Sequence, residues 1–122
     1  MKAPEDQPIL IVDPDVHFRD RLHNFLLSAG YENVDSAKSF TEALERVEES
    51  EYHIVVVNAV SNLEGGIRSA DNITLLSPKT KVILMVGPED QPVSPDKHRR
   101  QFLIKATFTR DLLYLLEKDA EM

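Results

Sequence analysis

The sequence predicts an α/β fold in which helices cover both faces of a parallel β-sheet. Short apolar runs alternate along the chain with segments whose apolar residues recur every three or four positions, as strands alternate with amphipathic helices. Four runs are apolar at nearly every position, which is typical of strands buried on both faces. They are residues 9–12, 54–57, 82–86 and 102–104. A fifth, more polar run at 33–37 predicts an edge strand.

Four helices are predicted from the segments around these strands. The first ends at Gly30, where glycine permits a left-handed C-cap. The second begins at Ser39, which has the spacing of a capping box with Glu42, and the third ends at Ser77-Pro78. Their apolar stripes are Phe18, Leu22, Phe25, Leu26 and Ala29; Phe40, Ala43, Leu44 and Val47; Ile67, Ala70, Ile73 or Thr74, and Leu76; and, in the last helix, Leu112, Leu113, Leu116 and Ala120.

The connection between the fourth and fifth strands lacks a helical pattern. Residues 96–101 offer no apolar side chain to bury, and the segment before them is rich in proline. We therefore expect a fourth helix that is shortened or missing, with a proline-rich loop crossing in its place. The sheet near residues 82–86 would then be thinly covered.

Length and composition limit the classes of function. A chain of 122 residues fits a single domain, 1–122, in which residues 1–7 form a disordered or extended tail. The net charge of -7 disfavours binding to nucleic acid or to anionic membranes. The absence of cysteine excludes disulfides and thiolate metal sites, and the sequence has neither a secretion signal nor a membrane-spanning run. These features predict a soluble, cytoplasmic protein.

Three other motifs have ordinary structural interpretations. The histidines His17, His23, His53 and His98 lack the spacing of a helical metal site, so surface positions are expected. The basic run 97–100 is interpreted as a solvated loop. Gly65-Gly66 lacks the pattern of a phosphate loop and is expected to permit the turn into the third helix.

Four stretches of the sequence carry a resemblance to a known family. They are 9–13 (ILIVD), 52–58 (YHIVVVN), 77–85 (SPKTKVILM) and 102–105 (FLIK). With the order of the predicted elements, they resemble the receiver domain of bacterial response regulators over essentially the whole chain. The resemblance implies a flavodoxin-like, five-stranded sheet in the order 2-1-3-4-5. It also implies that Asp13, Asn58, Val86 and Lys105 converge at the carboxyl ends of the strands.

The resemblance implies a Mg²⁺ site that this sequence has lost in part. The family has two adjacent acidic residues after the first strand, whereas this chain reads Asp13-Pro14. Mg²⁺ requires several hard oxygen ligands in octahedral geometry, so Asp13 alone is too little. We therefore expect Mg²⁺ binding to be weak or absent, and no other cofactor. Asp15 is expected to interact with the N-terminus of the first helix instead.

Asn58 stands where the resemblance implies a phosphate-accepting aspartate. An amide oxygen is a poorer nucleophile than a carboxylate and cannot form an acyl phosphate. Two interpretations of Asn58 stay open: a selected neutral surrogate that hydrogen-bonds Lys105 or a loop carbonyl, and drift at an unused site. Val86 stands where the family has a Thr or Ser hydroxyl, so it cannot hydrogen-bond a phosphoryl group.

The resemblance also assigns two positions in the last strand. Lys105 matches the lysine that contacts the phosphoryl group in the family, and here we expect it to pair with Asp13 or Asn58. Ala106 replaces the proline that follows this lysine, so the usual cis peptide bond is not expected. Phe102 takes the place of an aromatic residue that switches between exposed and buried states, and we expect it to stay inward.

These departures predict a degenerate receiver, or pseudo-receiver, with no enzymatic activity. It would act as a phosphorylation-independent protein-interaction module in a two-component phosphorelay. The expected partner is a signalling protein such as a histidine kinase or another regulator. A homodimer through the surface of the fourth and fifth strands and the last helix is also compatible with the sequence.

Three alternatives remain at this stage. A displaced carboxylate, Asp13 or Asp15, would accept the phosphoryl group, or the chain would be the receiver piece of a longer transcriptional regulator. A flavodoxin-like binder of a nucleotide or flavin is disfavoured, because no Gly-rich or Ser/Thr-rich phosphate loop follows Val12.

Overall fold

The computed structural model describes residues 7–60 and 62–87, and the backbone of residues 101–104. Strands and helices alternate along the chain. The elements are β1 (Ile9–Val12), α1 (Val16–Ser28), β2 (Val34–Ala37), α2 (Phe40–Glu49), β3 (Ile54–Asn58), α3 (Leu63–Leu76), β4 (Lys81–Val86) and β5 (Gln101–Ile104). The strands form one sheet in the order β2-β1-β3-β4-β5, and every neighbouring pair is parallel. The predicted α/β fold and the order 2-1-3-4 are confirmed, with β2 at an edge.

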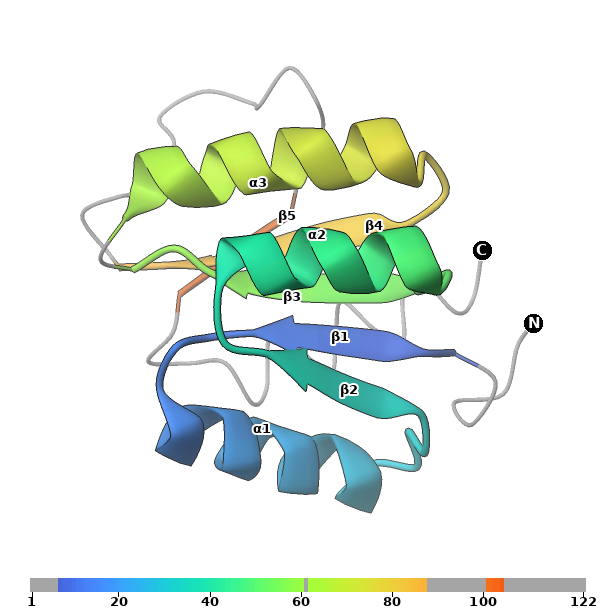
Figure 1. Cartoon of the computed structure of the whole chain (residues 1–122). Coiled ribbons are helices and arrows are strands. Elements are labelled where there is room, and N and C mark those ends of the chain that lie inside the picture. Colours follow the sequence, from blue (N-terminus) through green and yellow to red (C-terminus); the bar gives the residue numbers. More distant parts are fainter. Residues whose placement is uncertain (1–6, 61, 88–100, 105–122) are drawn as a thin grey trace.

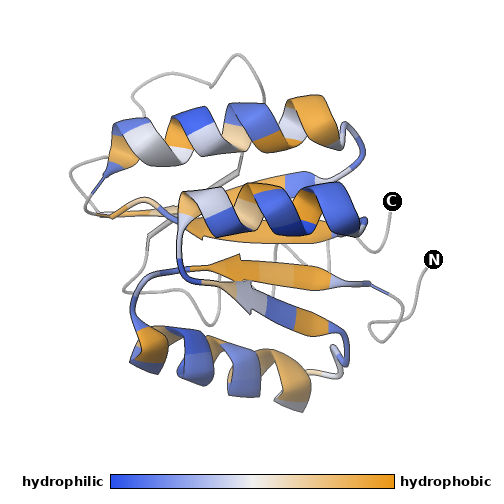
Figure 2. Ribbon diagram, in the orientation of Figure 1, coloured by the Kyte–Doolittle hydropathy of each residue, from blue (hydrophilic) through white to orange (hydrophobic). Residues whose placement is uncertain are grey.

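Helix α1 lies on one face of the sheet, and α2 and α3 lie on the other (Figure 1). Strands β1, β3 and β4 are hydrophobic along most of their length, whereas β2 and the helices contain both hydrophobic and hydrophilic positions (Figure 2). Because successive side chains of a strand point to opposite faces, the sheet supplies two separate cores. Each fully buried aliphatic side chain contributes about 1.5–3 kcal/mol to the stability of the fold.

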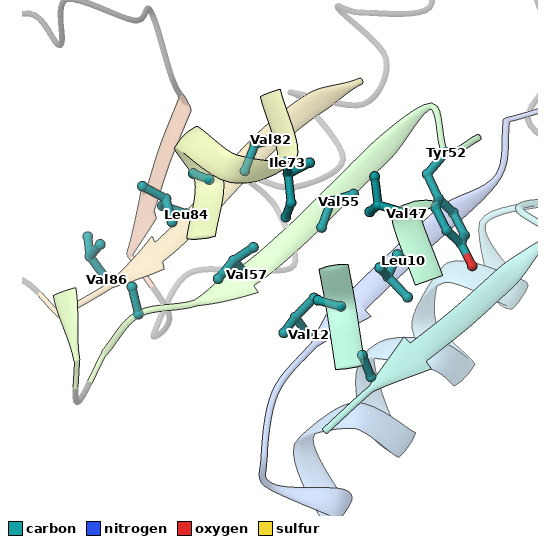
Figure 3. Close-up of a cluster of buried hydrophobic side chains, with 14 residues drawn as sticks. Leu10, Val12, Val47, Tyr52, Val55, Val57, Ile73, Val82, Leu84 and Val86 are labelled. Carbon is teal, nitrogen blue, oxygen red and sulfur yellow. The ribbon is translucent and has the colours of Figure 1, made fainter. Parts of the chain in front are cut away.

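The two cores divide the apolar residues of the chain between the two faces. The core against α1 contains Ile9, Ile11, Phe18, Leu22, Leu26, Tyr31, Val34, Ile54, Val56, Ile83 and Met85. The core against α2 and α3, shown in Figure 3, contains Leu10, Val12, Ala37, Ala43, Val47, Tyr52, Val55, Val57, Ala59, Ala70, Ile73, Val82, Leu84 and Val86.

The expected thin cover over the fourth strand is wrong. Residues 82–86 of β4 are at most 5% exposed. Alternate side chains of this strand enter the two cores, Ile83 toward α1 and Leu84 toward α3. This strand therefore offers no exposed apolar surface for a homodimer.

The helix ends follow local chemistry. Gly30 has φ 99°, the left-handed conformation that glycine adopts without steric cost, and it follows the C-cap of α1. The hydroxyl of Ser39 accepts a hydrogen bond from the backbone N–H of Glu42 at 3.1 Å, as the capping-box spacing predicts. The N-cap of α3 is Asn62, whose side-chain oxygen accepts from the N–H of Gly65 at 2.9 Å.

Two expectations for the third helix are wrong. Gly65 and Gly66 lie inside α3 rather than in a turn before it. A Cβ at residue 66 would lie 2.5 Å from that of Ala59, so glycine permits close packing of α3 on the segment after β3. Leu76, predicted to be buried, is 48% exposed, because the buried stripe of α3 runs through Ala70 and Ile73.

Several predictions fall on residues outside the described part of the chain. They concern the crossover at 88–100, Lys105, Ala106 and the last helix, with Leu112 among its residues.

Gln7, which the sequence placed in the N-terminal tail, is fully buried.

Candidate functional site

Parallel pairing brings three of the predicted site positions to one edge of the sheet. Val12 of β1 pairs with Val57 of β3, so the next residues, Asp13 and Asn58, occupy neighbouring positions. Asn58 pairs with Met85 of β4, and Val86 follows. The carboxyl ends of the three central strands thus meet at this edge, which is where open α/β sheets bind their ligands.

Asp13 is held in place by its backbone and its side chain. The residue is 1% exposed. Its N–H donates to the carbonyl of Ala37 at 3.0 Å, and its Oδ1 accepts from the N–H of Asp15 at 2.9 Å. The guanidinium of Arg19 donates to the Asp13 carbonyl at 2.6 Å. The carboxylate is therefore fixed at the start of the loop, and the exposed ring of Pro14 follows it.

The side chain of Asn58 forms a turn with its own loop. Its Oδ1 accepts a hydrogen bond from the N–H of Val60 at 3.0 Å, and the residue is half-buried. This is the Asx-turn geometry that asparagine and aspartate favour. The predicted partners of Asn58 were Lys105 or a loop carbonyl, and this local bond was not predicted, although the turn preference of asparagine is a signal for it.

Val86, the third predicted site residue in the described part of the chain, is the last residue of β4 and has an aliphatic side chain. It is fully buried in the core against α2 and α3 (Figure 3). A buried isopropyl group donates and accepts no hydrogen bond, so this position contributes packing only. The remaining predicted site residues, Lys105 and the side chain of Phe102, lie outside the described part of the chain.

Asp15 caps α1, as its predicted interaction with the helix N-terminus requires. Its Oδ1 accepts from the N–H groups of His17 at 2.9 Å and Phe18 at 3.4 Å. These bonds satisfy backbone donors that have no partner within the helix. One of the two oxygens that a displaced acceptor could use, Oδ1, is therefore engaged in capping the helix.

We expect Asp15→Ala to lower the free energy of unfolding by about 1 kcal/mol, the usual contribution of such a cap. Asp15→Ser retains a capping oxygen and should stay close to the unmodified chain. Urea denaturation in the presence of a chelator measures both, because metal ligation then contributes nothing. Equal stability of the alanine variant and the unmodified chain would show that the cap is not stabilising.

The donor set at this edge does not fit Mg²⁺. The ion prefers near-octahedral coordination by hard oxygen ligands, of which one or two are usually carboxylates. Asp13 and Asp15 each use an oxygen for a backbone amide, Pro14 has no side-chain oxygen, and Asn58 is neutral and bonded to Val60. Among the described residues, no three His, Cys, Asp or Glu side chains are grouped to hold a metal ion.

Comparisons with known proteins agree with this architecture. The family model of the response regulator receiver domain matches residues 9–113. No curated protein matches the chain significantly. In the described part of the chain, no helix has the length and apolar character needed to cross a membrane.

Solved structures of receivers from distant organisms have the same fold. The response regulator TrrA of Thermotoga maritima, solved in complex with Mg²⁺-BeF, is 23% identical with a TM-score of 0.80, and 93% of this chain and 98% of that chain are covered. A CheY-like receiver domain protein of Methanospirillum hungatei is 25% identical with a TM-score of 0.77, and 94% of each chain is covered. CheY4 of Vibrio cholerae is 20% identical with a TM-score of 0.73, and 92% and 97% are covered. The family match over most of the sequence, on this sheet order, places the chain in the response regulator receiver domain family of two-component signalling.

Proposed function

We propose that this receiver domain is degenerate and acts as a phosphorylation-independent protein-interaction module in two-component signalling. The observation that carries the proposal is the state of Asn58, a neutral amide whose oxygen is already bonded to the N–H of Val60. An amide in this position supplies neither the nucleophile nor the charge that acyl phosphate formation requires. The domain transmits its signal through binding.

The surroundings of Asn58 support the same proposal. Among the residues that the structure describes, Asp13 is the carboxylate beside Asn58 at the strand ends. Pro14 and Val86 stand where the family has a second carboxylate and a hydroxyl. Three departures at one site are harder to reconcile with phosphotransfer than one. The structure of TrrA was solved with Mg²⁺-BeF; we propose that this chain does not take up that complex.

The partner in this proposal is another protein of the signalling pathway, such as a histidine kinase or a second regulator. Receiver domains act by contacting partner proteins. In this chain the contact does not require phosphorylation. The rigid sheet and its two cores then serve as the scaffold that presents the binding surface.

Incubation of the chain with acetyl phosphate and Mg²⁺, followed by intact mass measurement, tests the proposal. We expect no gain in mass, while TrrA treated in parallel serves as a second receiver in the assay. Calorimetric titration should likewise detect no Mg²⁺ binding at about millimolar Mg²⁺, the concentration at which weak divalent-cation sites fill. A gain of one phosphoryl unit would support acceptance at Asp13 or Asp15, and its loss in Asp15→Ala would locate it.

A further inference from the structure

A groove lies where the C-terminal ends of α2 and α3 come together, at the edge of the sheet opposite Asp13 and Asn58. Its volume is about 450 Å³. Both helices run toward the same end of the molecule, where the end of α3 is hydrophobic and that of α2 is hydrophilic (Figure 2). The groove therefore combines an apolar wall with a charged one.

The apolar wall combines the buried core residue Val47 with side chains that the fold leaves in water. Val47, Leu76 and Pro78 line the groove, and Leu76 is 48% exposed. Leu75, which precedes it at the end of α3, is 80% exposed. Val16, Leu27, Leu75 and Leu76 are the large apolar residues exposed in the described part of the chain. Leu75 and Leu76 are consecutive, and Leu76 lines the groove, as at a surface that a partner covers.

The other wall carries negative charge. Glu48, Glu49 and Glu51 line the groove and are exposed, and Lys79 is the one cation among the lining residues that the structure describes. A second depression, of about 480 Å³, shares Glu49 and continues along α2. The acidic lining thus extends beyond the groove itself.

The two helix ends add to this potential. The C-terminus of a helix carries a partial negative charge, and basic residues in the last turn usually offset it. The last turn of α3 has none. In α2 the last turn has Arg46, whose guanidinium lies 3.8 Å from the carboxylate of Glu42. Positive charge on a partner would therefore be attracted to this end of the molecule.

We propose that the groove docks a basic amphipathic segment of a partner protein. Its aliphatic side chains cover Leu75 and Leu76, and its lysines or arginines lie opposite Glu48, Glu49 and Glu51. Charge complementarity selects this occupant over an acidic segment, and the exposed leucines select it over a purely basic one. The site is remote from Asn58, so it goes beyond the proposed function and holds whether or not the strand-end site accepts a phosphoryl group.

A synthetic helical peptide of leucine and lysine, amphipathic in pattern, serves as the probe, beside a matched peptide with glutamate in place of lysine. Titration of the isotopically labelled chain, followed by NMR, should shift the backbone amides of residues 47–51 and 75–79 with the lysine peptide only. Leu76→Ser and the double variant Glu49→Lys/Glu51→Lys should each weaken binding about tenfold, as for central contacts of an interface. Raised salt should weaken binding further.

Matched controls lie on exposed positions away from the groove. Leu27→Ser and Glu32→Lys change the same residue types and should leave the affinity unchanged. Leu75→Ser provides a second test at a nearly fully exposed position if Leu76→Ser melts below the unmodified chain. Shifts centred elsewhere, equal affinity for the glutamate peptide, or equal weakening by the controls would overturn the proposal. Self-association that Leu76→Ser abolishes, without peptide binding, would also overturn it in favour of a second copy.

Discussion

Asn58→Asp alone is expected to leave the chain almost unphosphorylated by acetyl phosphate in Mg²⁺. The substitution supplies a carboxylate nucleophile, and one of its oxygens can keep the bond to the N–H of Val60. It leaves the metal site incomplete, because Pro14 still offers no oxygen beside Asp13. Without a bound cation, the negative charges of the carboxylate and the incoming phosphoryl group repel each other.

The triple variant Asn58→Asp/Pro14→Asp/Val86→Thr is expected to accept a phosphoryl group, seen as a gain of one such unit in intact mass. The change at residue 14 adds a second carboxylate at an exposed position, where it disturbs no packing. The change at residue 86 adds a hydroxyl that can contact the phosphoryl oxygens. Because Val86 is fully buried, this hydroxyl should cost about 1–3 kcal/mol of stability unless it finds a partner.

The matched control separates the metal from the nucleophile. Pro14→Asp/Val86→Thr, with Asn58 retained, should bind Mg²⁺ more tightly than the unmodified chain yet gain no mass. Thermal melting of every variant shows whether it is folded under the assay conditions. Full phosphorylation of the single variant Asn58→Asp would instead mean that the rest of the site is intact, and the proposed degeneracy would be wrong.

The fold could be predicted from the sequence because its signals are local. Continuous apolar runs mark strands buried on both faces, and the helix ends at Gly30 and Ser39 depend on residues within a few positions of each other. Gly65-Gly66 is a case that local sequence signals do not predict. The pair was expected in a turn, but the reason for a glycine at residue 66 is its close approach to Ala59 from another element.

The candidate site was predictable in position and less so in its bonds. The resemblance placed Asp13 and Asn58 together at the carboxyl ends of the strands, and the pairing of Val12 with Val57 puts these next residues at neighbouring positions. The bond from Val60 to Asn58 follows from the conformation of the loop, which periodicity does not report. The groove of α2 and α3 was not foreseen, since it depends on how two helices lie together. Leu76, read as buried from its spacing, is one of its exposed residues.

A buried tyrosine makes stability depend on alkaline pH. Tyr52, labelled in Figure 3, is 3% exposed. Its hydroxyl donates to Oδ2 of Asp35 on the edge strand at 2.7 Å. Burial, followed by the hydrogen bond and the negative charge of Asp35, raises the pKa of Tyr52 from 10.0 to about 12. The carbonyl of Tyr52 also accepts from the hydroxyl of Thr80 at 2.6 Å, which fixes the segment before β3.

The direction of the pH effect follows from this raised pKa. Between about pH 10 and about pH 12 the folded chain keeps a proton that the unfolded chain releases. The stabilisation is therefore fully present below pH 10 and is lost as pH rises toward 12. A shift of two pKa units corresponds to a loss of about 3 kcal/mol. Because lysines titrate in the same range, the effect has to be isolated by comparison with Tyr52→Phe.

The difference in unfolding free energy between the unmodified chain and Tyr52→Phe, measured by urea denaturation at each pH, isolates this contribution. At neutral pH the variant should be less stable by about 1–2 kcal/mol, because the hydrogen bond to a charged group is lost. Across pH 10–12 the unmodified chain loses about 3 kcal/mol and Tyr52→Phe does not, so the difference should fall to zero and then change sign. Asp35→Asn keeps a hydrogen-bond acceptor and removes the negative charge. It should lower the pKa of Tyr52 and so narrow the pH range over which stability is lost. A difference that stays constant up to pH 12 would show that the hydroxyl of Tyr52 does not hold its proton more tightly in the folded chain.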